Sequence, residues 1–341
     1  MSTPAAESFE SLIDLAAESY GGKALAASDE FFAAKENLLK PGRGEFIPGK
    51  YTENGKWMDG WESRRKRVPG HDWCLVRLGL PGVIHGVDVD TNHFTGNYPE
   101  HASLEGCEAA REAPVEQLLG AQTEWSELLP ISTLQGGSRN LFAVSARKRF
   151  THVRLHIYPD GGVARLRVHG EVSPDWNRAR TSEGLVDLAA LENGGIAVAT
   201  NDQYFGHGNN LIAPGEPLHM GEGWETRRKR GPGNDWLVVR LAANGSLKKA
   251  EVHTTHFKGN HPDRCSLEGI LLPRDVPLGF LASRSLAWQA VLPQTKLEAH
   301  SKHVFDQALR VHGPFSHVRL SIYPDGGVAR LRLFGTRAET T

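Results

Sequence analysis

The chain contains the same sequence twice. Residues 152–167 read HVRLHIYPDGGVARLR and residues 317–332 read HVRLSIYPDGGVARLR, so that fifteen of sixteen positions match. Upstream, GWESRRKR at residues 60–67 returns as GWETRRKR at residues 223–230. The motifs DW, HFxGNxP and SLEG then follow in the same order in both halves. A repeat of this length is far longer than the roughly 20–50 residues of a solenoid unit, so it predicts two homologous domains in tandem.

The repeat also predicts where the domains divide. The last shared motif of the first copy ends shortly before a polar segment at residues 171–180, EVSPDWNRAR, which has the composition of a linker. We therefore expect a first domain at residues 1–172 and a second at residues 173–341.

Within each copy the hydrophobic pattern is that of β-strands. Apolar runs of strand length occur at residues 72–80 and 235–241, and residues 87–90 alternate apolar and acidic side chains. Residues 152–170 alternate on both sides of the turn sequence YPDGG. This pattern predicts a β-hairpin with one apolar face and one cationic face.

Turn-forming residues outnumber helical signals. The 37 glycines and 19 prolines favour many turns and short strands. Helical patterns are sparse, at residues 9–18, 31–39 and 109–119. The sequence therefore predicts an all-β fold in which each copy is an antiparallel sandwich or jelly roll, with few short helices.

Composition excludes several classes of protein. The 39 basic and 40 acidic residues leave a net charge of −1, which argues against a dedicated nucleic-acid partner. No apolar run approaches the roughly 18–20 residues of a membrane-spanning helix, so no membrane partner is expected. The N-terminal stretch at residues 1–22 is acidic and lacks the basic and apolar regions of a secretion signal. The three cysteines are far apart, which fits a reducing, cytoplasmic location.

The repeated motifs, taken together, resemble those of the allantoicase family. The resemblance rests on HVRLxIYPDGGVARLR, GWExRRKR followed by DW, HFxGNxP, SLEG and the opening SDEFF with ENLL, and it covers nearly the whole chain. It implies two jelly-roll domains of the galactose-binding-like type. It also implies hydrolysis of the small molecule allantoate to ureidoglycolate and urea, by a homo-oligomeric enzyme.

Arginines are the natural partners of the carboxylate of such a substrate, because the guanidinium group makes bidentate hydrogen bonds. If the hairpins form, each brings three arginines to one face, and the basic runs add more. The candidates for substrate binding are Arg65, Arg67, Arg154, Arg165, Arg167, Arg228, Arg319, Arg330 and Arg332. The alternatives are that these arginines pair with Glu62, Glu105 and their counterparts to brace the sheet, and that the basic runs are solvated loops.

Proton transfer needs titratable groups. In the first copy Asp88 is followed two and five residues later by Asp90 and His93. In the second copy Glu251 is followed at the same spacing by His253 and His256. The candidates for acid–base catalysis are Asp90, His93, Glu105, His253, His256 and Glu268. The sets Asp88/Asp90/His93 and Glu251/His253/His256 could instead hold a divalent metal ion, or could only fix a loop by hydrogen bonding. No other cofactor is expected.

The copies differ at a few positions within otherwise matching motifs. Asp90 is matched by His253 and His156 is matched by Ser321. Either the two domains contact different parts of a substrate, or one copy has kept only its scaffold.

Two other functions compete with the family's activity. A tandem jelly roll could be a non-enzymatic ligand-binding protein. A metal-dependent amidohydrolase could act on allantoate but release ammonia instead of urea.

Overall fold

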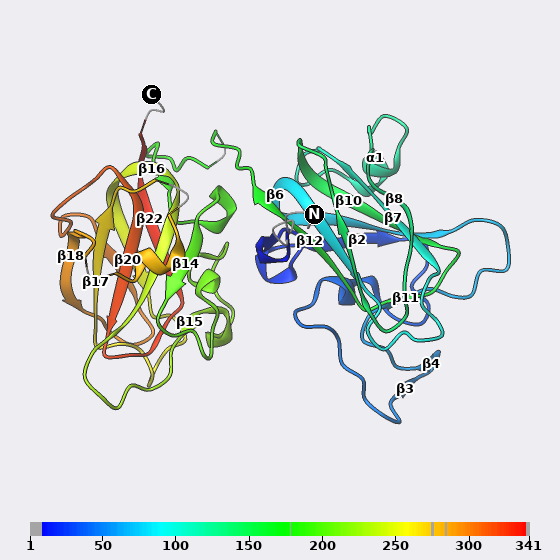
Figure 1. The fold of residues 1–341 in the computed structure, drawn as a ribbon, viewed down its shortest axis with the longest axis horizontal. Coiled ribbons are helices and arrows are strands. Elements are labelled where there is room, and N and C mark those ends of the chain that lie inside the picture. Colours follow the sequence, from blue (N-terminus) through cyan, green and yellow to red (C-terminus); the bar gives the residue numbers. More distant parts are fainter. Residues whose placement is uncertain (1–8, 178, 274–275, 284, 339–341) are drawn as a thin grey trace, which may run out of the picture. The chain divides into compact units, whose positions relative to one another are not determined.

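The chain forms two compact units, residues 1–173 and residues 174–341. The structure is a computed structural model that describes residues 9–177, 179–273, 276–283 and 285–338. Residues 1–8, which belong to the stretch without secretion-signal character, lie outside the described residues. Both units are almost entirely β-structure (Figure 1), so the predicted all-β fold class is confirmed.

The first unit contains twelve strands and one α-helix among its described residues. The strands are β1 (Ile13–Asp14), β2 (Lys23–Ala27), β3 (Tyr51–Thr52), β4 (Gly55–Lys56), β5 (Trp61–Glu62), β6 (Asp72–Asp90), β7 (His101–Cys107), β8 (Ser126–Thr133), β9 (Arg139–Ala143), β10 (Arg149–Tyr158), β11 (Gly162–Val163) and β12 (Arg165–Val172). The helix is α1 (Val115–Leu119), and single 3₁₀ turns lie at η1 (Phe9–Ser11), η2 (Glu18–Tyr20) and η3 (Lys35–Leu39).

The second unit repeats this order. Its strands are β13 (Val186–Asp187), β14 (Ile196–Thr200), β15 (Trp224–Glu225), β16 (Asp235–His253), β17 (Arg264–Ile270), β18 (Gln289–Lys296), β19 (Lys302–Phe305), β20 (Phe315–Tyr323), β21 (Gly327–Val328) and β22 (Arg330–Arg337). Its helices are α2 (Leu278–Leu281) and the 3₁₀ segments η4 (Leu191–Asn193), η5 (Gly208–Ile212) and η6 (Met220–Glu222).

One long strand builds each sandwich. The first part of β6 pairs with β10 and β2, and its second part pairs with β12 and β9. The crossing falls at Gly82, where a Cβ atom would lie 2.1 Å from the carbonyl oxygen of Glu171, so only glycine fits. We call the two halves the β10 sheet and the β12 sheet. In the second unit β16 joins the β20 sheet to the β22 sheet in the same way.

The predicted hairpin at residues 152–170 is wrong. β10 pairs with β6 and β7, β12 pairs with β6 and β1, and the two strands do not pair with each other. The turn between them carries the chain from one sheet to the other. Alternation correctly identified the buried side of each strand, since Leu155 and Leu166 are fully buried. However, both strands face the same core from opposite sides, so their outward faces point in opposite directions.

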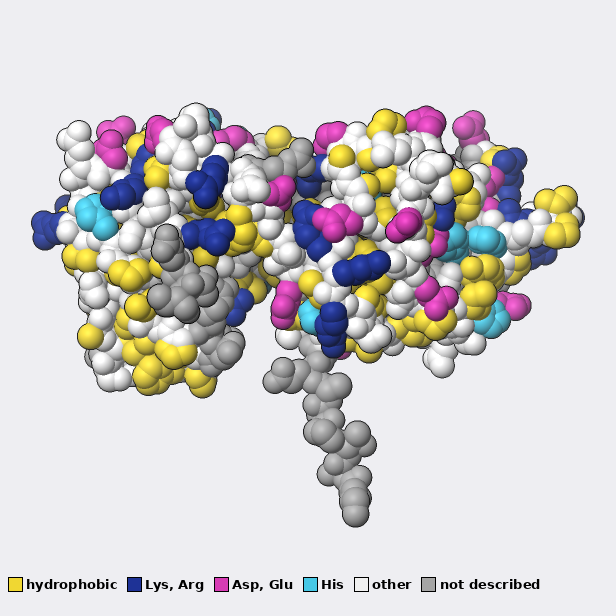
Figure 2. Space-filling model, turned by 90° about the horizontal axis from the view of Figure 1, so that it is seen from above, with side chains coloured by type: hydrophobic (Ala, Val, Ile, Leu, Met, Phe, Trp, Pro, Cys, Tyr) yellow, Lys and Arg dark blue, Asp and Glu magenta, His cyan; other side chains and the backbone are white. Residues whose placement is uncertain are grey.

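The three predicted helices are shorter than expected or are replaced. Residues 9–18 form η1 and the strand β1, residues 31–39 contain η3, and residues 109–119 contain α1. No helix of the described chain is long and apolar enough to cross a membrane. On the face drawn in Figure 2, basic and acidic side chains are interspersed, as the balanced composition predicts.

Candidate functional site

The outer face of the β12 sheet carries two of the predicted acidic residues. Asp88 and Asp90 lie side by side on β6, as alternation predicted, but both are buried and both already have a cationic partner. Arg139 Nε donates to Asp88 Oδ2 at 2.6 Å, and Arg43 binds both oxygens of Asp90 at 2.7 and 3.0 Å. Asp90 therefore holds the loop that carries Arg43 against the sheet, and Asp88 binds the first residue of the neighbouring strand β9.

Two predicted substrate-binding arginines lie on the same face and are also bound to other residues of the protein. Arg165 is only 3% exposed, and its Nη2 donates to Asp59 Oδ2 at 2.7 Å. Arg167 donates to the backbone carbonyls of Lys40 and Gly42. Because both guanidinium groups are bound to other residues of the protein, they stabilise the packing against this sheet.

The Arg165–Asp59 pair gives a stability prediction. Burial alone would raise the pKa of Asp59, but the bonds from Arg165 and from a backbone amide outweigh burial and hold this pKa below its ordinary value. Asp59→Asn leaves a buried guanidinium without its counter-charge, so we expect the free energy of unfolding to fall by about 3 kcal/mol. Urea-induced unfolding of the whole chain, followed by tryptophan fluorescence, measures the loss.

The second copy supplies the control for this prediction. Arg330, the counterpart of Arg165, donates to the backbone carbonyl of Glu222 and not to its carboxylate. Glu222→Gln should therefore change the free energy of unfolding by less than about 1 kcal/mol. Equal losses in Asp59→Asn and Glu222→Gln would contradict the assignment of the charge pair.

His93 does not join the acidic residues on β6. It is exposed, its backbone has a φ of 68°, and its ring lies against Phe46 with 5.7 Å between ring centroids. Asp90 is held by Arg43, and no hydrogen bond joins it to His93 within the described chain. The structure therefore does not assemble the predicted Asp90–His93 acid–base pair.

The corresponding second-unit residues are also separated. His253 Nε2 lies 3.2 Å from Glu251 Oε2, and burial lowers the pKa of His253. His256 turns away, with its Nε2 at 2.9 Å from the carbonyl oxygen of Pro217 and its backbone amide donating to His300 Nδ1. Among the described residues, no three His, Cys, Asp or Glu side chains are grouped so that they could hold a metal ion.

Arg330 and Arg332 are braces like their first-unit counterparts. Arg330 donates to the backbone carbonyls of Asn210 and Gly215, and burial lowers its pKa to about 10. Arg332 donates to the backbone carbonyls of Ala213 and Gly215. Together with the sheet topology, these contacts correct the prediction that three arginines of each copy converge on one face.

The repeated sequence motifs do converge, at one end of each sandwich. We call this place the motif junction, formed by residues 60–67, 93–99 and 158–163 in the first unit. The hydrogen bonds that tie the segments include those from Ser63 N to Gly161 O, Gly162 N to Asn97 O, Lys66 N to Asp160 Oδ2 and Asn97 Nδ2 to Glu62 Oε1. Burial raises the pKa of Glu62.

The second unit has the same junction, at residues 223–230, 256–262 and 323–328. The equivalent bonds run from Thr226 N to Gly326 O, Gly327 N to Asn260 O, Lys229 N to Asp325 Oδ2 and Asn260 Nδ2 to Glu225 Oε1. The duplicated motifs therefore form one conserved scaffold within this chain.

A cavity opens at the second motif junction. It has a volume of about 390 Å³ and is lined by Phe205, Glu225, Thr226, Arg228, Gly259, Asn260, His261, Asp263, Pro324, Asp325 and Gly326. Pockets of this size hold small molecules. The predicted residue Arg228 thus lies in a cavity with amide, carboxylate and imidazole groups, which suits a small ligand with a carboxylate and several N–H groups.

Arg65 occupies the same position in the first junction. Arg65, Arg67 and Arg228 are exposed, and within the described part of the chain none of them has an ion-pair partner. Arg64, in contrast, is bound to Asp29 at 2.8 Å. The members of the basic run are therefore distinct. Arg65, Arg67 and Arg228 have exposed guanidinium groups that can meet a ligand, and of these Arg228 lines the cavity.

Sequence reasoning missed a chain of titratable side chains beside the first junction. His71 Nε2 lies 2.9 Å from His156 Nδ1, and His156 Nε2 lies 2.8 Å from Glu105 Oε1. Arg154, opposite Glu105 on the neighbouring strand, also binds Glu105. The ring of His71 rests on Tyr158 with 4.7 Å between centroids. One sequence signal could have revealed this series of hydrogen-bonded side chains, since His156 is the position at which the two copies of the sixteen-residue repeat differ.

The second unit keeps only part of this arrangement. Arg319 binds Glu268 with Nη2 at 2.6 Å from Oε2, which matches the pairing of Arg154 with Glu105. Ser321 takes the place of His156, and Asn234, which precedes the strand β16, takes the place of His71. No imidazole chain can form there.

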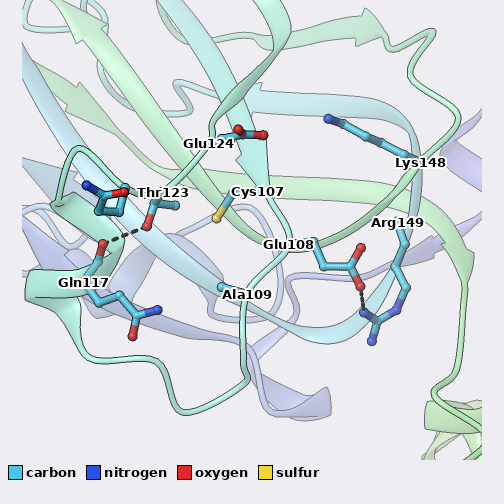
Figure 3. Close-up of a pocket in the computed structure, with 9 residues that line it drawn as sticks. Cys107, Glu108, Ala109, Gln117, Thr123, Glu124, Lys148 and Arg149 are labelled. Atoms are coloured by element: carbon cyan, nitrogen blue, oxygen red, sulfur yellow. Dashed lines mark hydrogen bonds and ion pairs between the residues drawn. The ribbon is translucent and has the colours of Figure 1, made fainter.

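A further pocket of about 420 Å³ lies in the first unit, at the opposite end of β10 (Figure 3). Two of its lining pairs bind each other, Glu108 with Arg149 and Thr123 with Gln117. None of the predicted site residues lines it. Burial raises the pKa of its cysteine, Cys107, to about 11, which leaves an unreactive thiol near neutral pH.

Comparisons with known proteins point to one family. A family model described as the allantoicase repeat matches residues 13–173 and 186–338. A probable allantoicase of Burkholderia mallei is 50% identical over 324 residues, covering 95% of this chain and 94% of the relative. A probable allantoicase of Pseudomonas paraeruginosa is 48% identical over 96% of both chains. The crystal structure of an allantoicase from Saccharomyces cerevisiae superposes with a TM-score of 0.78, at 33% identity over 96% of both chains.

Proposed function

The chain belongs to the allantoicase family, and from that premise we propose that it hydrolyses allantoate to ureidoglycolate and urea. Such an enzyme is a hydrolase of carbon–nitrogen bonds in linear amidines. The observation that carries the proposal is the match of both copies to the allantoicase repeat, along nearly the whole chain. The gathering of the repeated motifs at one junction in each unit supports it.

The substrate's chemistry sets the requirements of the site. Allantoate is a carboxylate whose central carbon carries two ureido groups, and hydrolysis replaces one of them by a hydroxyl. The site must hold the carboxylate, protonate the departing urea nitrogen and remove a proton from the remaining ureido group or from water. The junction offers an unpaired guanidinium group for the first task.

We assign carboxylate binding to Arg65 and Arg228. Both are exposed. Arg228 lines the cavity together with Asn260 and Glu225, whose side chains bond to each other at 2.7 Å. Arg65 is its sequence counterpart in the first junction, where Asn97 and Glu62 bond to each other at 2.7 Å. A planar guanidinium matches the two oxygens of a carboxylate. Apart from the exposed Arg67, the other predicted arginines are bound to acidic groups or backbone carbonyls, so we do not assign carboxylate binding to them.

The order of bond changes follows from the same chemistry. Departure of urea gives an acyl-imine at the central carbon, and water then adds to that carbon. Hydrolysis in water enriched in oxygen-18 should place the label in ureidoglycolate and leave the released urea unlabelled. Label in urea would mean that water attacks a ureido carbonyl, which contradicts this order.

A product assay tests the proposed function. Purified protein incubated with allantoate should release urea, measured with urease-coupled detection, and no ammonia in the absence of urease. Ammonia without urease would indicate the metal-dependent amidohydrolase, and loss of urea release after chelation would indicate a metal requirement. No urea from folded protein would leave the ligand-binding alternative.

Assembly and location belong to the same proposal. The family resemblance implies a homo-oligomer, and three free, buried thiols fit a reducing cytoplasm. Light scattering coupled to size-exclusion chromatography measures the subunit number.

A further inference from the structure

The two copies share the scaffold of the motif junction but differ in the side chains beside it. In both, a lysine of the basic run binds the aspartate that begins the long strand, Lys66 with Asp72 at 2.7 Å and Lys229 with Asp235 at 2.9 Å. Only in the first unit is that aspartate preceded by a histidine, His71. Because the surrounding contacts are the same, the two units differ here in a titratable side chain and not in the contacts that hold it.

The hydrogen bonds among Glu105, His156 and His71 fix which ring nitrogen of each histidine carries the proton. Glu105 can only accept while ionised, so His156 donates its Nε2–H to Glu105. The neutral ring of His156 then has a lone pair on Nδ1, which accepts the Nε2–H of His71. The remaining nitrogen of His71, Nδ1, therefore carries a lone pair that is available to a ligand. This is the arrangement by which a carboxylate holds an imidazole in the tautomer of a general base.

The surroundings of His156 and Glu105 favour a neutral His156 and an ionised Glu105. Burial lowers the pKa of His156, and the bond to Glu105 opposes but does not cancel this effect, so His156 is neutral near pH 7. Arg154 compensates the charge of Glu105 and lies over the ring of Trp125, 4.7 Å from its centroid. The ring of His71 also lies against Tyr158, and the residue that follows it, Asp72, is paired with Lys66.

Lys66 connects the segment of the proposed carboxylate anchor, Arg65, with the segment of His71. Lys66 follows Arg65 in sequence, its backbone amide is fixed by Asp160, and its ammonium group reaches Asp72, next to His71. The Lys66 side chain therefore links the segment that carries Arg65 to the start of β6, which follows His71.

We infer that His71 is a catalytic residue that transfers protons, that Glu105 and His156 position it, and that hydrolysis takes place in the first unit. This inference rests on the proposed function. His71 Nδ1 takes the proton of one ureido N–H while the bond from the central carbon to the other ureido nitrogen breaks, and it gives that proton to the departing urea. It then takes a proton from water as the oxygen bonds to the central carbon, and returns it to the imine nitrogen.

The second copy provides substitutions that the fold already accommodates. His156→Ser and His71→Asn each install the residue that stands at the same place in the second unit. We expect either change to lower kcat by about 100-fold, the lower end of what a positioned acid or base contributes. The double variant should lose no more than either single one, because the two histidines act as one unit.

The pH profile separates proton transfer from a structural role. In the wild type, kcat should fall at acid pH, where His156 takes up a proton and can no longer accept the Nε2–H of His71. In His156→Ser the part of the acid limb that belongs to His156 should be absent. Thermal unfolding of each variant should remain close to the wild type.

Asn234→His is the matched control, since it adds an imidazole to the second unit without touching the first. It should leave kcat within about twofold, as surface changes usually do. If the wild type releases urea and His156→Ser keeps its kcat and pH profile, the inference is wrong while the proposed function stands. If folded wild-type protein releases no urea, the proposed function fails and the inference fails with it.

Discussion

Arg65→Ala should lower kcat/KM for allantoate by about 100- to 1,000-fold, because loss of a guanidinium–carboxylate contact costs about 2–5 kcal/mol. Arg65 is exposed at the motif junction and has no ion-pair partner within the described chain, so its charge is available to a ligand. Most of the effect should fall on KM, since the contact exists both before and during the reaction. Steady-state kinetics of urea release provides the measurement.

Two variants of the same basic run sharpen this test. Arg65→Lys keeps the charge but not the planar fork, so it should recover only part of the activity. Arg64→Ala removes a charge of the same sign one residue away, but Arg64 is bound to Asp29 and points to a different partner. Equal losses in Arg64→Ala and Arg65→Ala would show that the run acts through its overall charge, against the assignment of Arg65.

Gly162→Val should destabilise the first unit by about 4 kcal/mol. Urea release should fall in proportion to the fraction of protein that is unfolded. A Cβ atom at residue 162 would lie 2.0 Å from ring atoms of Phe94, which is fully buried. The backbone of Gly162 is fixed by its bond to Asn97, so the ring has to leave the core. This change breaks the junction where two repeated motifs meet, and thermal unfolding measures it.

The control for this prediction lies in another segment of the same junction, residues 93–99. A Cβ atom on Gly96 would meet nothing within 4 Å, so Gly96→Ala should be tolerated with little change in the unfolding temperature. Gly327→Val should repeat the loss in the second unit, since its Cβ would lie 1.9 Å from the ring of Phe257. A stable Gly162→Val protein would contradict the close packing described here.

The family resemblance is confirmed, and with it the duplicated all-β fold. Alternation also placed Asp88 and Asp90 on one outward face of a strand. The same reasoning failed for Arg154 and Arg165, which lie on different sheets although they are eleven residues apart. It also missed His71, whose partner His156 is 85 residues away.

The sequence by itself determined that this protein consists of two related β-sandwiches, because a repeat and a period-two pattern are local properties that can be counted along the chain. It also determined which side of the strands β10 and β12 carries the buried apolar residues. Only the tertiary structure decided which arginines are bound to other residues of the protein and which remain available to a ligand. It also decided which histidines are hydrogen-bonded to each other. These outcomes depend on which strands pair and on which loops cover the outer faces, and both are set by contacts between residues that are distant in sequence.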